Sequence, residues 1–413
     1  MSATVHVIGA GLAGLAAAIA LVGAGRRVGL YDASPHAGGR CRSYLDRDLG
    51  LTLDNGNHLL LSGNRAAMDY LARIGARDAL TGPAVPEFPF LDLATGARWT
   101  LRPNRGRIGW WIAAPSRRVP GTRVADYLRL LALARIRDDR TVSEALPENT
   151  LFHRLAAPLA IAALNTPPEQ GLARLLGAVL RETLLAGGAS AIPLLPRVSL
   201  GAALIEPALA TLRGRGAAIH LACRIAALEG TDGRVTTLRA AEGDIVLGAE
   251  DSAVLAVPPW VAASLLPGLV VPDAFESILN LHFAIRAGAP RLLGLLGGTA
   301  EWVFVKSDHV SVTVSAANRI VDLPAEDLVA RVWPEVARAL SLPAALPPWR
   351  VVKEKRATFA ATAAQERRRP GPRTEFANLA LAGDWTATGL PATIEGAIRS
   401  GFRAAALLAP IAS

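Results

Sequence analysis

The chain contains little cysteine and little lysine. Among its 413 residues only Cys41 and Cys223 are cysteines, and they have neither disulfide-framework nor metal-ligand spacing. We therefore predict no metal site and expect a reducing, cytoplasmic setting. Lysine occurs only at positions 306, 353 and 355, so arginine carries nearly all of the basic charge.

Long apolar runs are also absent. Hydrophobic residues make up 51% of the chain, but no uninterrupted run approaches the roughly 20 residues that span a bilayer. We expect the surplus in a large core, an apolar cavity, or both. Residues 8–24 carry no charge, which suggests a signal peptide or anchor. We reject that interpretation because no basic segment precedes them and three glycines stand at turn spacing.

The net charge of +9 is compatible with a nucleic acid, an anionic membrane, or neither. Abundant Ala, Arg, Gly and Pro suggest GC-rich codons, so part of the basicity has a genomic origin. We expect no nucleic-acid partner. The charge is densest in residues 102–140, where ten Arg face three Asp around Trp110-Trp111. Within this stretch we predict a helix over residues 124–137.

The stretch Val5–Asp32 has the pattern of a dinucleotide-binding turn. A short apolar strand leads into Gly9-Ala10-Gly11-Leu12-Ala13-Gly14, an Ala-rich helix follows, and a second strand ends at Asp32. Gly9 suits a tight turn, Gly11 lets the backbone approach a pyrophosphate, and Gly14 permits close packing of helix and strand. The helix N-terminus offers free N–H groups to phosphates, and Asp32 is placed to accept ribose hydroxyls.

Two later stretches also have residues suited to binding a dinucleotide. Gly38-Gly39-Arg40 is a second glycine turn, with an arginine suited to phosphate, although an ordinary surface loop is the alternative. Near the end of the chain an apolar strand leads to Gly383-Asp384-Trp385 and a helix over residues 393–408. A strand, an acid and a helix N-terminus thus recur, as expected for a site at the carboxyl ends of parallel strands.

Other segments are less regular. Asp54-Asn55-Gly56-Asn57-His58 is a polar turn, in which a purely structural role for His58 is the alternative to a functional one. Residues 192–196, IPLLP, are too rich in proline for a helix interior or a central strand. From these patterns we predict a division into three nucleotide-domain parts (1–80, 199–270 and 346–413) and two substrate-domain parts (81–198 and 271–345).

These motifs together resemble the FAD-dependent amine oxidase and phytoene desaturase superfamily. The resemblance is carried by the fingerprint at 5–32, the Gly38-Gly39-Arg40 turn, AVPPW at 256–260 and the segment 383–401. More narrowly, DNGNH at 54–58, AALNTP at 162–167, LPRV at 195–198 and GDWT at 383–386 resemble the hydroxysqualene dehydroxylases of bacterial squalene and hopanoid synthesis. The resemblance covers nearly the whole chain. One departure is Asp32, where many relatives carry Glu.

The resemblance implies an α/β fold: a Rossmann-like FAD-binding domain with an interleaved α+β substrate domain. It implies non-covalent FAD, held by Gly9, Gly11, Leu12, Ala13, Gly14, Asp32, Ala33, Gly39, Arg40, Asn57, His58, Ile225, Gly383, Asp384, Pro391, Ala392 and Thr393. For the substrate it suggests Asn165, Pro167 and Leu195.

The implied reaction is reductive removal of the allylic hydroxyl of hydroxysqualene, with reduced FAD as hydride donor. Such a reaction needs a general acid, for which His58, Asp54 and His282 are the candidates by chemistry alone. A second GxGxxG motif is absent, so we expect an external reductant rather than a bound NAD(P)H. We also expect a long-chain isoprenoid partner and a peripheral contact with the anionic inner face of the plasma membrane. We expect this contact on an exposed surface of residues 102–140, around Trp110-Trp111.

Three alternatives remain. A carotenoid desaturase would use the same fold with oxidised FAD. An amine oxidase usually frames its flavin with two aromatic residues, one of them just before the C-terminal helix. In this chain Thr393 stands at that place and no Tyr follows Tyr127, which argues against an amine oxidase. A non-catalytic prenyl-binding relative would not need the flavin-binding residues at both ends of the chain.

Overall fold

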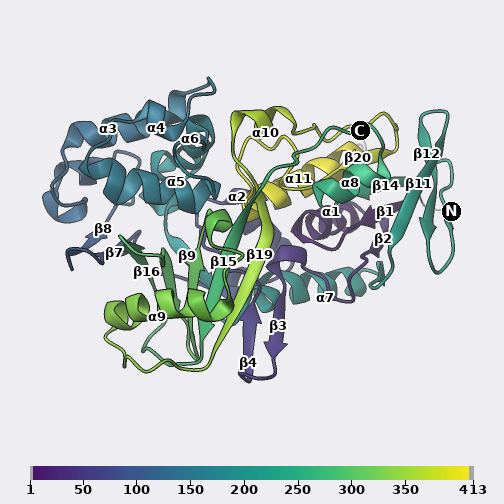
Figure 1. Ribbon diagram of the computed structural model, residues 1–413. Coiled ribbons are helices and arrows are strands. Elements are labelled where there is room, and N and C mark those ends of the chain that lie inside the picture. The colour runs from purple at the N-terminus through teal and green to yellow at the C-terminus, as the bar shows by residue number, and fades with distance from the viewer. Residues whose placement is uncertain (1–2, 409–413) are drawn as a thin grey trace.

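The computed structural model describes residues 3–408, and one of its two large sheets is a parallel sheet, which lies on the right in Figure 1. In spatial order the five strands are β10 (Ala218–His220), β2 (Arg27–Tyr31), β1 (Thr4–Ile8), β14 (Ser252–Leu255) and β20 (Leu379–Leu381). In chain order this is 3-2-1-4-5, so the winding reverses between β1 and β14, where doubly wound folds bind ligands. The predicted parallel α/β domain is confirmed, and its strands come from three separated stretches of the chain.

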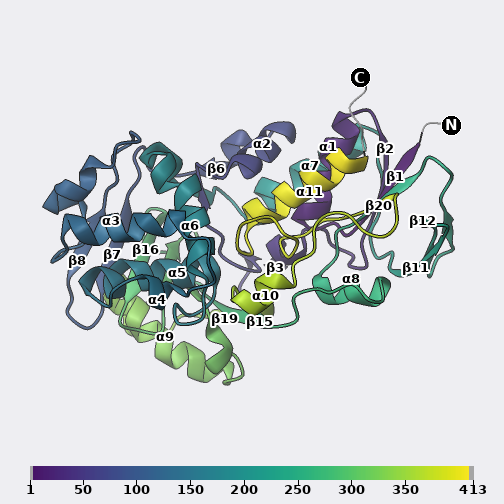
Figure 2. The same cartoon turned by 90° about the horizontal axis from the view of Figure 1, so that it is seen from above.

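Small residues let two helices pack closely beside this sheet. Helix α1 (Leu12–Gly23) lies along α11 (Ile394–Leu408), with α7 (Glu206–Gly214) nearby (Figure 2). A Cβ atom added at Gly401 would stand 2.1 Å from the carbonyl oxygen of Ala13. Most of α1 is buried, which explains its uniformly apolar sequence: the run is a core helix.

A seven-stranded, mostly antiparallel sheet forms the second part of the molecule. Its order is β19 (Trp349–Phe359), β15 (Phe275–Phe283), β18 (Val310–Val314), β17 (Trp302–Val305), β16 (Arg291–Leu296), β7 (Phe88–Asp92) and β8 (Arg98–Leu101). Successive residues of a strand face opposite sides. Accordingly Phe90 packs into a core shared with helices, whereas Leu91 belongs to the core beneath α9 (Ala325–Leu340).

The helices on the Phe90 side form a cap at the upper left of Figure 1. They are α3 (Val124–Ala132), α4 (Val142–Ala145), α5 (Ala157–Leu164) and α6 (Ala173–Glu182). The remaining helices are α2 (Arg65–Arg73), α8 (Pro259–Leu265) and α10 (Ala363–Arg367). Along residues 3–408, every helix is too short or too polar to cross a bilayer.

Two predictions for the stretch 102–140 need correction. The predicted helix over residues 124–137 ends as α3 at Ala132, followed by a 3₁₀ turn over Leu133–Arg135. Trp111, expected beside Trp110 on an exposed surface, is only 4% exposed and packs edge-on against Tyr127, with ring centroids 5.1 Å apart. Trp110 is 53% exposed, so only one of the two indoles faces solvent.

The proline-rich segment 192–196 is also corrected. It forms strand β9 (Pro193–Pro196), the middle strand between β5 (Leu60–Leu61) and β6 (Leu80–Thr81). Strand β5 pairs with the first half of β9 and β6 with the second half. Each half needs only a short ladder, so two prolines at the strand ends are tolerated although they donate no hydrogen bond.

Two small antiparallel sheets complete the set of sheets in the described residues. A hairpin of β3 (Ser43–Asp46) and β4 (Leu51–Asp54) leads toward the second sheet, and the sheet of β11 (Ile225–Thr231), β12 (Arg234–Ala240) and β13 (Ile245–Val246) lies beyond the parallel sheet. The chain thus crosses repeatedly between the two large sheets. The division into five segments stays a proposal, and its last boundary needs correction: β19, which falls in the part 346–413, pairs with β15 in the second sheet.

A half-buried carboxyl group, that of Glu301 just before β17, should make stability depend on pH. Burial raises the pKa of Glu301 to about 7, although the Ser315 amide donates to it at 2.8 Å. Below about pH 4.5 the carboxyl is protonated in both the folded and unfolded states. As the pH rises toward 7 only the unfolded state ionises, so the fold loses stability, by roughly 3 kcal/mol in all.

We therefore expect Glu301→Gln, which mimics the neutral acid, to raise the free energy of unfolding at pH 8 by up to about 3 kcal/mol. At pH 4.5 the gain should vanish. Denaturant unfolding at both pH values measures this difference in the free energy of unfolding. An equal effect at both pH values would show that Glu301 is not protonated in the fold.

Candidate active site

The carboxyl ends of β1, β14 and β20 meet closely around Gly9. A Cβ atom at Gly9, where φ is +109°, would stand 2.4 Å from the carbonyl oxygen of Ala256. The indole of Trp385, just after β20, donates to the carbonyl of Val257 at 2.9 Å. Three segments predicted separately, around residues 9, 256 and 384, therefore lie at one edge of the sheet.

The N-terminus of α1 is built to receive an anion. Gly11 is its N-cap, no side chain caps the helix, and Leu12, Ala13 and Gly14 of its first turn are buried. A Cβ added at Gly11 would meet no atom within 4 Å, whereas one at Gly14 would stand 1.8 Å from the Gly9 carbonyl oxygen. Open space at Gly11 next to uncapped amides fits the phosphates of a dinucleotide.

The second glycine turn packs directly on the first. The Gly38 amide donates to the Ala10 carbonyl at 2.8 Å, and Gly11 and Gly38 pair as an isolated parallel bridge. A Cβ at Gly39, where φ is +55°, would lie 3.6 Å from the Cα of Gly11. The positive φ angles of Gly38 and Gly39, 108° and 55°, favour glycine at both positions, and the backbone contacts show that this turn packs on the first rather than forming an independent surface loop.

Asp32 and the residues after β2 form the adjoining wall. The carboxylate of Asp32 accepts from the Ala10 amide at 2.6 Å and the Ser34 amide at 2.7 Å. The Cys223 amide donates to the Asp32 carbonyl at 2.8 Å, which brings Ile225 to the same edge, beyond Ala33. Each carboxylate oxygen keeps a lone pair, so Asp32 can still accept ribose hydroxyls.

Arg40 and Asp384 close the site from opposite ends of the chain. Arg40 Nη2 lies 2.6 Å from Asp384 Oδ1, and Arg40 Nη1 donates to the carbonyl of Ala357. Asp384 is buried, whereas the side chain of Arg40 is 39% exposed. The pair joins the glycine turn of residues 38–40 to the loop after β20.

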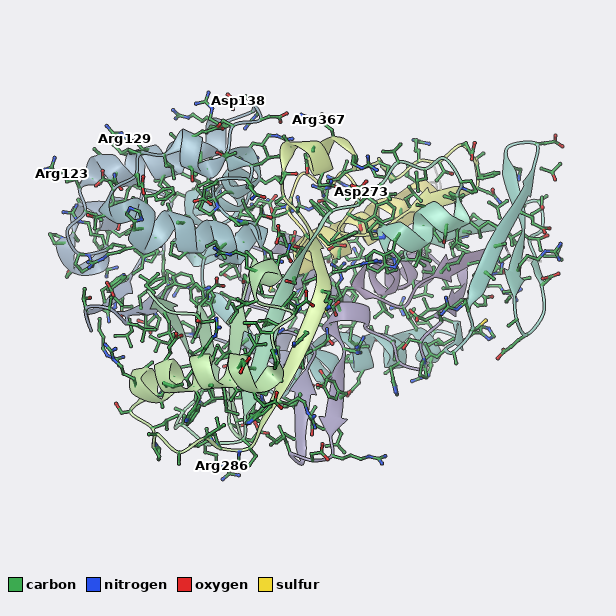
Figure 3. All side chains as sticks on the ribbon, in the orientation of Figure 1. Arg123, Arg129, Asp138, Asp273, Arg286 and Arg367 are labelled. Carbon is green, nitrogen blue, oxygen red and sulfur yellow. The ribbon has the colours of Figure 1, made fainter. Side chains whose placement is uncertain are left out.

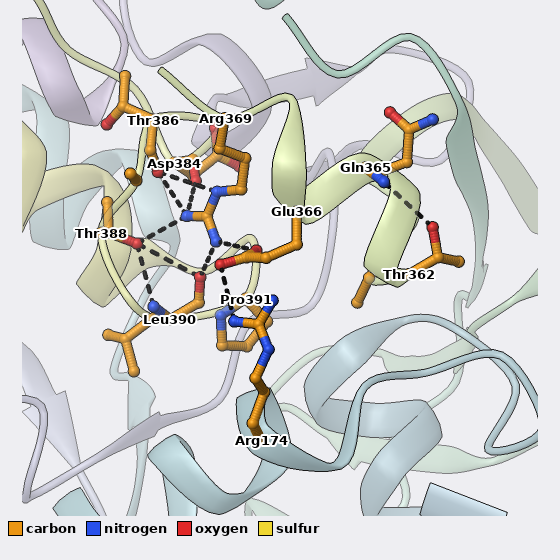
Figure 4. A network of polar contacts seen from close by, with 12 residues as sticks. Arg174, Thr362, Gln365, Glu366, Arg369, Asp384, Thr386, Thr388, Leu390 and Pro391 are labelled. Atoms are coloured by element: carbon orange, nitrogen blue, oxygen red, sulfur yellow. Dashed lines mark hydrogen bonds and ion pairs between the residues drawn. The ribbon is translucent and has the colours of Figure 1, made fainter. Parts of the chain in front are cut away.

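The loop from Asp384 to Ala392 is held from inside by Arg369 (Figure 4). The fully buried guanidinium of Arg369 donates to the carbonyls of Asp384, Thr386 and Leu390 and pairs with Glu366 at 2.7 Å. At the end of the loop the hydroxyl of Thr393 accepts from the Gly396 amide at 3.0 Å. Pro391 and Ala392 are thereby placed at the start of α11.

A cavity of about 530 Å³ adjoins the second sheet. Its lining combines apolar residues from several strands with a polar group of Asp54, Asn57, His58 and Lys306. Lys306 Nζ lies 2.7 Å from Asp54 Oδ2, and Leu195 lines the cavity on the side of β9. Asn57 Nδ2 donates to Ser311 at 2.7 Å, which ties the polar turn to β18.

The three candidate general acids, His58, His282 and Asp54, can be compared by their protonation state at pH 7. Burial lowers the pKa of His58 to about 4 and that of His282 to about 3, so both imidazoles are neutral at pH 7. Burial raises the pKa of Asp54, but the charge and hydrogen bond of Lys306 outweigh this, and the net pKa lies below its ordinary value. Asp54 is therefore ionised, and none of the three holds a proton ready for donation.

Comparison with known proteins identifies the family. The chain matches the family described as flavin containing amine oxidoreductase over residues 12–285 and 289–409. It is 50% identical over 412 residues to hydroxysqualene dehydroxylase of Rhodopseudomonas palustris, covering 99% of both chains, and 47% identical to that of Sinorhizobium fredii, covering 98% of both. The chain belongs to the flavin-containing amine oxidoreductase family, among the hydroxysqualene dehydroxylases.

A solved structure agrees on the fold. A redesigned putrescine oxidase superposes with a TM-score of 0.73 at 16% identity, covering 99% of both chains. The predicted resemblance and the fold class are thus confirmed, and the protein is a flavin-dependent oxidoreductase. The uncapped helix amides, the open Gly11 and the Arg40–Asp384 pair are the features that fit a phosphate-bearing flavin cofactor.

Two of the three residues suggested for substrate lie elsewhere in this flavin oxidoreductase. Asn165 is 4% exposed and has a positive φ of 48° at the end of α5. Its amide donates to Thr358 at 2.9 Å and accepts from the Ala316 amide at 2.7 Å, so it joins the helical cap to the second sheet. Neither Asn165 nor Pro167 lines the cavity, and Leu195 does.

Sequence reasoning missed Lys306 and Arg369. The scarcity of lysine was a usable signal for Lys306, because one of three lysines lines the cavity. Arg369 lies in a run of arginines, Arg367-Arg368-Arg369, and nothing in the sequence distinguishes the buried one. Across residues 3–408, no three His, Cys, Asp or Glu side chains gather in a metal-binding arrangement.

Proposed function

We propose that this flavoenzyme reductively removes the allylic hydroxyl of hydroxysqualene to give squalene. The observation that carries the proposal is the near full-length identity of 50% to an enzyme named for this activity. The cavity of about 530 Å³ has apolar lining residues from several strands, among them Leu195, Leu292 and Phe304, and these support a long isoprenoid as substrate. Bound and reduced FAD would supply the hydride.

The chain would contribute binding, orientation and exclusion of water. Residues of the first glycine turn would hold the pyrophosphate at the N-terminus of α1, and Asp32 would bind the adenosine ribose. Apolar residues such as Leu195, Leu292 and Phe304 line the cavity and would exclude water from a cation-like carbon, which water would otherwise convert back to the alcohol.

Non-covalent attachment of FAD is part of the proposal. Both cysteines are buried, and burial raises the pKa of Cys41 to about 12, so its thiol is not a nucleophile at neutral pH. Neither cysteine lies in the segment between β20 and α11. Acid denaturation should therefore release all the yellow colour into the supernatant.

Anaerobic incubation with hydroxysqualene tests the reaction. With photoreduced flavin we expect squalene and oxidised flavin in equal amounts, and with oxidised flavin no conversion. Conversion of a carotenoid precursor by the oxidised enzyme, without dehydroxylation by the reduced one, would favour a desaturase instead. A purified protein without flavin absorbance would contradict both and favour the non-catalytic prenyl-binding alternative.

We also propose that the enzyme docks on an anionic membrane through the loop of residues 105–110. Arg105, Arg107 and Ile108 are exposed, with Ile108 at 81%. The exposed ring of Trp110 carries the guanidinium of Arg117, 4.8 Å from its centroid. An apolar tip ringed by arginines suits a membrane interface.

A further inference from the structure

Lys306 is one of three basic residues that line the cavity, and unlike the exposed Arg197 and Arg291 it is only partly exposed. Its ammonium lines the cavity and lies 2.7 Å from the carboxylate of Asp54, with the lysine side chain 21% exposed and the aspartate 4%. An ammonium has three N–H donors. Among residues 3–408 only Asp54 accepts from the Lys306 ammonium, so two of its N–H donors remain for a group within the cavity.

Asp54 is itself fixed by the surrounding protein. Its Oδ1 accepts from the hydroxyl of Ser43 at 2.6 Å and from the Leu200 amide at 2.9 Å, while Oδ2 accepts from Lys306. Three donors from separate parts of the chain thus hold one carboxylate. Because that carboxylate cannot turn, it orients the ammonium at one point of the cavity wall.

The choice of lysine here is chemically informative. The chain uses arginine almost everywhere, and its other lysines, Lys353 and Lys355, lie on β19 and do not line the cavity. A guanidinium keeps its proton and would pair with Asp54 at least as well. An ammonium can release a proton, so a function in proton transfer explains why lysine stands at position 306.

We propose that Lys306 is the acid that protonates the leaving hydroxyl and that Asp54 is its positioning residue; this rests on the proposed function. The carbon–oxygen bond breaks with its electron pair going to oxygen, which takes a proton from Lys306 and leaves as water. The carbon takes up the hydride supplied by reduced flavin. Lys306, left as a neutral amine, regains a proton from water at the cavity mouth.

The first test compares leaving groups. Hydroxysqualene and its acetate ester are each turned over anaerobically once by pre-reduced wild type, Lys306→Met and Lys306→Arg. An acetate leaves without needing a proton. The turnover rate should therefore fall only for the alcohol, by about 100-fold or more in both variants. The ester-to-alcohol rate ratio should rise accordingly, and to a smaller extent in Asp54→Asn.

The matched control is Lys355→Met, which breaks a surface Lys–Asp pair of 2.6 Å to Asp322 and should leave the ratio unchanged. Flavin content verifies that each variant is folded. Because Lys306→Met leaves the buried carboxylate of Asp54 unpaired, the double variant Asp54→Asn, Lys306→Met is measured as well to remove that carboxylate. An unchanged ratio in Lys306→Met, or a normal alcohol rate in Lys306→Arg, would overturn the proposal. Absence of squalene from wild type with either substrate would overturn the proposed function instead.

Chemical rescue provides a second, independent readout. In Lys306→Ala, methylammonium should restore alcohol turnover, whereas tetramethylammonium, which carries the charge but no acidic proton, should not. A merely structural ion pair predicts equal effects of both cations. Equal rescue would therefore count against proton donation by Lys306.

Discussion

Gly11→Val is expected to give a folded but colourless protein. Gly11 has φ −74° and ψ 176°, a conformation open to any residue, and a Cβ there would meet no protein atom within 4 Å. The fold should therefore tolerate the side chain. The same open space borders the uncapped amides of α1, where the FAD pyrophosphate would approach, so valine should block the cofactor.

The loss of FAD binding expected in Gly11→Val can be compared with the loss expected in Asp32→Ala. Loss of charge-assisted hydrogen bonds at Asp32 should weaken FAD binding by about 1.5–3 kcal/mol for each bond, or roughly 10- to 150-fold. Gly11→Val should exceed this because it excludes the ligand sterically. Flavin absorbance per protein measures occupancy, and circular dichroism verifies the fold.

Two other glycines of the same helix serve as controls. Gly23, at the far end of α1, also has no atom within 4 Å of an added Cβ, so Gly23→Val should retain FAD. Gly14→Ala should unfold the turn, because its Cβ would stand 1.8 Å from the Gly9 carbonyl oxygen. Near-normal FAD occupancy in Gly11→Val would mean that the dinucleotide lies elsewhere.

The nucleotide side of the site was predictable because it depends on local backbone geometry. Glycines at fixed spacing, a helix start and an acid after the second strand each leave a direct trace in sequence. Their assembly followed from a general rule, since carboxyl ends of parallel strands meet at one edge. The contact of Trp385 with Val257 and the pairing of Arg40 with Asp384 realise that rule.

The cavity was harder to predict because its polar group depends on pairings between distant strands. Lys306 meets Asp54 only because β17 ends beside the loop that follows β4, 252 residues away along the chain. Asn165 shows the converse difficulty. Its motif suggested contact with substrate, but its amide is engaged by residues 193 and 151 positions away. Sequence spacing alone cannot distinguish these two uses of a polar side chain.

The membrane proposal illustrates the same limit. Sequence indicated an arginine-rich stretch with two tryptophans, and the structure leaves Ile108 and Trp110 exposed while burying Trp111. Arg123 and Arg129 lie at the outer edge of the helical cap (Figure 3). Transfer of an insoluble isoprenoid through water would cost about 0.8 kcal/mol for each exposed CH₂, so direct uptake from a bilayer is favoured.

Liposome flotation should separate docking from mere basicity. Wild type should float with anionic but not neutral vesicles at low salt. Ile108→Ser with Trp110→Ser, and Arg105→Glu with Arg107→Glu, should each stay in the soluble fraction while retaining flavin. Each arginine near an anionic surface contributes about 1 kcal/mol, so loss of two weakens binding by roughly 30-fold and charge reversal by more.

Matched controls lie far from this loop. Val246→Ser removes a 75% exposed apolar side chain from β13, and Arg213→Glu with Arg215→Glu reverses two exposed charges at the end of α7. Both should float like wild type because the loop stays intact, although the arginine control changes the global charge by the same amount as its test variant and the valine control removes one exposed apolar side chain. If the control and loop variants lose flotation equally, attraction to the membrane is a property of the net charge of +9 rather than of the loop of residues 105–110.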